Sequence, residues 1–154
     1  MSFNVVISSE DRIAGSSVTN AEYYFDWNNF RDDNASYEMS FVFQTQNDYY
    51  NPAGSTMPNK ILQLSLPDLP QLNYRTSSSI GANTSGVVGF IYPIIFAPAD
   101  NEQYYCAKGG DNPSVFVKSL PSNSVFKVDL VTPASVTTPD IPDSYMLILS
   151  FKKI

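Results

Sequence analysis

The fold class of this chain is decided by one short segment, which reads YEMSFVFQ from Tyr37 to Gln44. Every second side chain in it is large and apolar, and most of the side chains between them are polar. Because successive side chains of a β-strand point to opposite faces, this period of two predicts a strand with one face in the core and one in solvent. We expect Phe41, in the middle of the segment, to be fully buried.

The same period recurs along the chain. Clear alternation predicts strands at 23–27, 62–66, 126–130 and 145–151, with Trp27 facing inward and Gln63 and Ser65 facing solvent. Less regular strands are predicted at 3–7 (at a sheet edge), 87–96 (apolar on both faces and therefore covered on both), 104–107 and 115–117. Pro93 requires a bulge, a bend or an edge in its strand. No segment shows the apolar spacing of a helix without Pro or Gly in it.

Turn-rich spacers separate these strands, and the longest of them are 45–59 and 66–86. Eight or nine short strands with such spacers favour two packed sheets, and long loops favour strands that cross between the sheets. We therefore predict an all-β fold, a single jelly-roll β-sandwich of about eight strands. Residues 1–154 are expected to form one domain, since no repeat or shift of composition divides them.

Composition excludes several kinds of function. The chain has 154 residues, no histidine, one cysteine (Cys106) and a formal net charge of −6 with only nine Lys and Arg. These counts exclude a Ser-His-Asp triad, a histidine-ligated metal and an internal disulfide, and they argue against direct nucleic-acid binding. No segment predicts a signal peptide or membrane insertion. We expect no enzyme activity, no cofactor and no catalytic or metal site.

The acidic segments and the thiol leave two interpretations each. Asp32-Asp33-Asn34 is either a solvated hairpin loop or a set of oxygen ligands for a hard cation such as calcium. Asp100-Asn101-Glu102 and Asp111 allow the same argument, and a carboxylate pair for glycoside hydrolysis needs only two suitable groups. Cys106 is either a buried, inert thiol or a reactive one.

Adjacent tyrosines are the most informative surface signal. They occur at 23–24, 49–50 and 104–105, and in a strand one member of each pair must face away from the core. Tyrosine is enriched at protein interfaces, and exposed aromatic rings also bind sugars, although single exposed aromatics are common on any surface. Tyr24, Tyr49 and Tyr50 are therefore interface candidates.

The N-terminal segment contains a polar turn directly after its predicted strand. It runs from Asn4 to Ser17 and includes Ser9-x-x-Arg12-x-x-Gly15-x-Ser17. The Arg12 guanidinium can either bind backbone carbonyls of its own turn or contact a neighbouring subunit, so Arg12 is a fourth interface candidate. Gly15 is expected to supply a backbone angle that other residues resist.

This opening, followed by the aromatic strands to Gln44, resembles those of small capsid proteins of large eukaryotic double-stranded DNA viruses. The C-terminal segment 145–151 resembles the last core strand of the same jelly rolls. The resemblance implies a structural capsid component (a minor capsid, penton-type or cement subunit) located in the virion and made in the host cytoplasm without secretion. Its partners would be other capsid proteins or copies of itself, in a homo-oligomer or a hetero-assembly.

Two other classes remain open. One is a carbohydrate- or receptor-binding jelly-roll module, which would use the same exposed aromatic rings. The other is a trimeric ligand head that resembles the tumour-necrosis-factor family, for which a secretory or membrane-anchor segment is expected and is not seen here. An oligomer or a co-assembly would favour the structural class, and a monomer that binds glycans would favour the module.

Overall fold

The structure is a computed structural model and describes residues 1–45, 61–69, 86–97, 102–131 and 144–154. Within these residues the chain is all-β, as predicted, and the helical segments are two 3₁₀ turns, η1 (Ser9–Asp11) and η2 (Trp27–Asn29). The nine strands are β1 (Ser2–Ser8), β2 (Asn20–Tyr24), β3 (Tyr37–Thr45), β4 (Leu62–Ser65), β5 (Val87–Ala97), β6 (Glu102–Ala107), β7 (Val115–Val117), β8 (Val125–Val131) and β9 (Tyr145–Lys153).

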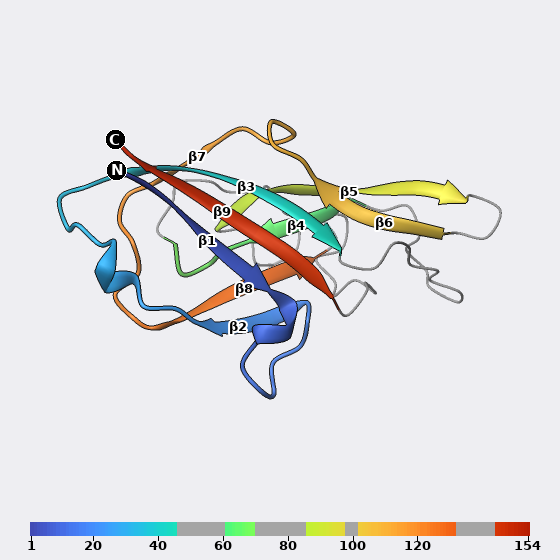
Figure 1. Cartoon of the computed structure of the whole chain (residues 1–154), viewed down its shortest axis with the longest axis horizontal. Coiled ribbons are helices and arrows are strands. Elements are labelled where there is room, and N and C mark those ends of the chain that lie inside the picture. The colour runs from blue at the N-terminus through green and yellow to red at the C-terminus, as the bar shows by residue number, and fades with distance from the viewer. Residues whose placement is uncertain (46–60, 70–85, 98–101, 132–143) are drawn as a thin grey trace, which may run out of the picture.

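The strands form one curled antiparallel sheet in the order β1-β9-β3-β6-β5-β4-β8-β2, and β7 pairs with β3 (Figure 1). The curl lies in β5, whose first half pairs with β4 and whose second half pairs with β6. We call β1, β9, β3, β7, β6 and the second half of β5 the long sheet, and the first half of β5, β4, β8 and β2 the short sheet. The two sheets face each other, which confirms the predicted β-sandwich of jelly-roll type.

Aromatic side chains fill the space between the sheets. The Trp27 ring lies 5.5 Å from Phe126 of the short sheet and 5.8 Å from Phe151 of the long sheet, between ring centroids. The hydroxyl groups of Tyr23 and Tyr145 form a buried hydrogen bond of 2.9 Å across the same space. Phe41 is 6% exposed, so the prediction of its burial is confirmed.

Three local predictions were wrong, and one of them is the cover expected on both faces of residues 87–96, since Ile94 is 38% exposed. The strand predicted at 23–27 ends at Tyr24, because the Asp26 carboxylate accepts the N–H of Asn28 and begins the 3₁₀ turn that carries the buried Trp27. Gln63 and Ser65 were expected in solvent, but both are buried, like the leucines of β4. Their side chains bond to each other (Gln63 Nε2 donates to Ser65 Oγ at 3.1 Å), which offsets part of the cost of burying them.

The change of strand partner along β5 accounts for the residues at positions 112 and 89. The Asn112 side chain bonds to both the N–H and the C=O of Phe90, at 2.8 Å each, and so replaces a strand beside the first half of β5. A Cβ at Gly89 would lie 2.6 Å from the Asn112 oxygen, so only glycine fits there. Pro93 lies in the second half of β5 and pairs with Tyr105 of β6, whereas residues 46–60, which precede β4, lie outside the described residues, so the bulge, bend or edge expected at Pro93 stays a prediction.

Candidate functional site

The outward face of the long sheet is divided into an apolar and a polar half. Paired residues of neighbouring strands lie on the same face, and the pairing places Val6, Ile148 and Val42 in one row. The apolar half consists of Val6, Val42, Ile94, Tyr104, Cys106, Met146 and Ile148. The polar half carries Ser2, Asn4, Glu38, Ser40, Ser150 and Lys152, and its one large apolar residue among the described residues is Phe116 of β7, which pairs with Glu38 and is 51% exposed. Val6 is 59% exposed and Ile94 is 38% exposed, so large apolar groups of this face meet solvent.

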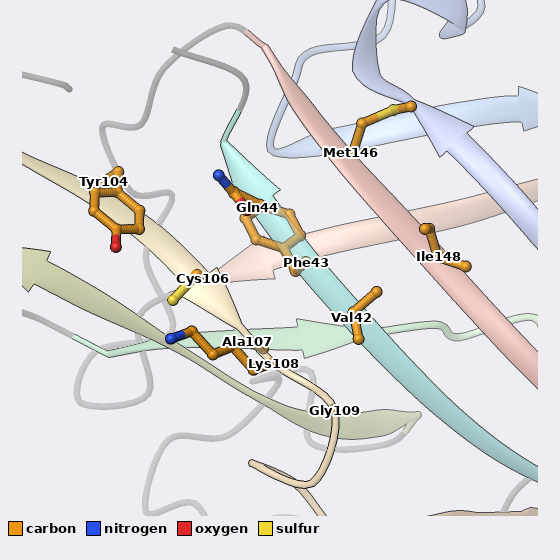
Figure 2. A pocket seen from close by; sticks show the side chains of 10 residues that line it. All are labelled: Val42, Phe43, Gln44, Tyr104, Cys106, Ala107, Lys108, Gly109, Met146 and Ile148. Atoms are coloured by element: carbon orange, nitrogen blue, oxygen red, sulfur yellow. The ribbon is translucent and has the colours of Figure 1, made fainter. Parts of the chain in front are cut away.

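A pocket of about 450 Å³ lies on the apolar half (Figure 2). Val42 and Ile148 lie side by side at one end of it, and Tyr104 and Cys106 come from β6 at the other. Gln44, Met146 and Lys108 complete most of the lining. Its volume lies within the range of ordinary binding pockets, and its lining is mostly apolar, so it suits an apolar group with Lys108 at the rim.

The thiol of Cys106 lies in this pocket. Cys106 is buried, and this burial raises the pKa of its thiol, which keeps the less reactive thiol form at neutral pH. The predicted burial of Cys106 is therefore confirmed. In the part of the chain that the structure describes, no three His, Cys, Asp or Glu side chains lie together in a way that would hold a metal ion.

Of the two predicted interface residues that the structure describes, Arg12 and Tyr24, Tyr24 is the more exposed. Its side chain is 73% exposed on β2, at the edge of the short sheet, whereas its neighbour Tyr23 is buried. Tyr24 thus lies on the other sheet from the pocket. Tyr49 and Tyr50 lie outside the described residues.

Arg12 lies within its own turn. Its Nη1 donates to the carbonyl oxygen of Ser9 at 2.7 Å, which is the intramolecular role considered for it. A contact of Arg12 with a neighbouring subunit stays a prediction. Gly15 has a φ of +92°, so the expected unusual backbone angle is confirmed.

The acidic loop at 32–34 has the contacts of a hairpin. Asp32 pairs with Lys153 and accepts the backbone N–H of Asn34, and both contacts lower the pKa of its carboxyl group. Arg31 pairs with Asp33 at 2.7 Å. These carboxylates are bound by cations of the chain itself, which favours the hairpin interpretation over a calcium site. Asp111 similarly accepts the N–H of Lys108.

Sequence reasoning missed the apolar half. The signal was present, because Val42, Met146 and Ile148 occupy positions that the alternation assigns to solvent. A single exposed apolar residue is common on any surface, so none of the three predicts a site by itself. Only the pairing of β9 with β3 shows that they lie together.

Comparison with models of known protein families finds no match, and comparison with curated proteins finds none either. Among the described residues, no helix has the length and apolar content needed to cross a membrane.

Proposed function

We propose that this chain is a structural component of a virus capsid (a minor capsid, penton-type or cement subunit) that acts through protein–protein contacts. The observation that carries the proposal is the apolar half of the long sheet's outward face. An exposed apolar surface with a pocket in it is typical of a site that another protein covers. The jelly-roll-type fold and the resemblance of the N-terminal and C-terminal segments supply the viral context.

The pocket defines how such a contact would work. A neighbouring subunit would insert an aromatic or aliphatic side chain between Val42, Ile148 and Tyr104, where buried anchors contribute most of the binding energy. The polar half beside it would form the hydrated rim of the contact.

The test is the presence of the chain in purified virus particles from the cells that make it. Wild-type protein should band with the particles in a density gradient, and Ile148→Lys should be lost from them, since it places a charge at the pocket. Ser150→Lys is the matched control, because it adds the same charge to the same face of β9 in the polar half. Absence of the wild type from particles, or equal loss of both variants, would overturn the proposal.

A second candidate function is carbohydrate binding, and one hollow favours it. A shallow polar hollow of about 580 Å³ is lined by the turn residues 14–17 together with Asn20 and Glu22 of β2. The exposed Tyr24 ring lies two residues further along the same strand face. An aromatic ring beside amide and carboxylate groups offers both stacking and hydrogen bonds to a sugar.

A glycan array tests this candidate. Binding of a defined glycan that is lost in Glu22→Gln and kept in Glu38→Gln, the matched change on the long sheet, would support it. An array without a signal would exclude it for the glycans tested.

A further inference from the structure

The first strand leaves one side of its backbone open. β1 pairs with β9 along its whole length, and Lys153 N–H donates to Met1 C=O at 2.9 Å. In an antiparallel pair, the bonded residues alternate with residues whose N–H and C=O point the other way. Met1, Phe3, Val5 and Ile7 therefore bond to β9, and the backbone groups of Ser2, Asn4, Val6 and Ser8 point outward. Among the described residues, no strand lies beyond them (Figure 1).

In the part of the chain that the structure describes, β1 also lacks the usual protection of an edge strand. Proteins protect such edges with charged side chains, proline, bulges or a covering loop. The seven residues of β1, SFNVVIS, contain no charge and no proline, and their pairing with β9 shows no bulge. Ser2, Asn4 and Val6 are exposed. An uncharged, regular and exposed edge is suited to adding a further strand.

The other edge of the sheet differs in this respect. Ile13 N–H donates to Glu22 C=O at 2.7 Å, Glu22 N–H donates to Ser16 Oγ, and Asn20 N–H donates to Ser17 Oγ. The turn that Arg12 and Gly15 shape thus occupies the outward side of β2. Within the described residues, the chain covers the β2 edge of the sheet and leaves the β1 edge open.

We propose that β1 pairs antiparallel with β1 of a second copy of this chain, around a two-fold axis at Val5. In this register Ser2 lies opposite Ser8 and Asn4 opposite Val6 of the second copy. All four outward residues of each strand then bond, which gives about eight backbone hydrogen bonds. On the core side, Val5 meets Val5 and Phe3 meets Ile7, so apolar groups continue across the joined sheets. Shifting the register by two residues in either direction loses pairs at the ends.

The charges at the two ends of β1 favour a second copy in this orientation. Ser2 lies beside Lys152 of β9, whereas Ser8 is followed by the exposed Glu10 and Asp11. The two-fold axis brings the Lys152 end of one copy to the acidic end of the other, at both ends of the joint. The inference rests on the proposed function, because a structural subunit acts through such contacts, and it names the partner at this edge.

Cysteine pairs test the register. In a Cys106→Ala background, which removes the natural thiol, Ser2→Cys with Ser8→Cys should give a covalent dimer under mild oxidation, because these residues face each other across the joint. A Cα separation of about 5.5 Å there suits a disulfide. Each single variant is the matched control and should stay monomeric on a non-reducing gel. Cross-linking of the single variants as complete as that of the double variant would overturn the register.

Asn4→Pro tests the edge itself. It removes an outward N–H and leaves the bonds to β9, so it should raise the dimer dissociation constant at least about tenfold in sedimentation velocity, whereas Asn4→Ala should not. If circular dichroism shows Asn4→Pro unfolded, Val6→Lys replaces it. A wild type that stays monomeric at every concentration would overturn the inference. If the wild type is a monomer and is found in particles, the proposed function stands and this inference fails. If it is a dimer and is absent from particles, this inference stands and the proposed function fails.

Discussion

The two edge strands of the curled sheet differ in whether other described residues bind their outward backbone groups. β2 at one end is covered by the turn at 12–17, which binds backbone groups of Asn20 and Glu22. β1 at the other end carries outward backbone groups, an exposed Val6 and no charge. This difference indicates where a further strand can be added to the sheet. An open edge carries a risk of aggregation, because other chains can pair with it. An edge that has a partner carries no such risk, which is the basis of our inference for β1.

The largest loss of stability is expected from a change at the centre of the sheet, against which the effects at the edges can be compared. Phe41→Ala, in the third strand along the sheet order, should reduce the free energy of unfolding by about 3–5 kcal/mol, because it removes a large buried side chain and leaves a cavity. Chemical denaturation measures this loss. A loss below about 1 kcal/mol would mean that the core is not packed around this strand.

The next largest effect concerns the bond that joins the two sheets near their edges. Tyr23→Phe removes one partner of the buried Tyr23–Tyr145 hydrogen bond and should cost about 1–3 kcal/mol, because the other hydroxyl is left unsatisfied. Replacing both tyrosines with Phe should cost less than the sum of the two single changes. Additive losses in this double-mutant cycle would contradict the bond.

The same pair predicts a dependence on pH. Burial raises the pKa of both Tyr23 and Tyr145, so the folded state holds protons that the unfolded chain loses. Their contribution is therefore fully present below about pH 10, the pKa of a tyrosine in an unfolded chain, and is lost as the pH rises above it. Denaturation at alkaline pH should show this loss in the wild type and a smaller one in the double Phe variant.

The comparison of the edges also marks the limit of what could be predicted from the sequence. The strands could be predicted because apolar and polar side chains alternate along them, and the edge position of β1 was predicted as well. The protection of β2 could not be predicted, because it depends on how Ile13 and Ser16 reach Glu22 in space. The burial of Gln63 was missed for a similar reason, since alternation indicates only which side chains share a face.

A smaller change in stability tests whether the turn at 12–17 protects the edge strand β2. Gly15→Ala should cost about 1–2 kcal/mol, because a φ of +92° strains any residue with a Cβ. Gly109→Ala is the matched control, since Gly109 has open space around it and no such angle, and it should change stability by less than about 0.5 kcal/mol. Faster amide hydrogen exchange at Glu22 in Gly15→Ala alone would show that the turn protects this edge. Equal exchange in both variants would contradict that role.

The smallest change in stability is expected at Tyr24, where the cover of β2 ends. Because its side chain is 73% exposed, Tyr24→Ala should alter the free energy of unfolding by less than about 0.5 kcal/mol. If Tyr24 anchors a contact with another subunit, the same change should weaken assembly by about 2 kcal/mol, or roughly thirtyfold in the dissociation constant. Tyr24→Phe keeps the ring and should retain most of the affinity. Sedimentation of the three proteins separates these effects, with circular dichroism as the control for folding. Assembly of Tyr24→Ala equal to that of the wild type would contradict Tyr24 as an anchor and would favour the long sheet, with its pocket and its β1 edge, as the contact surface.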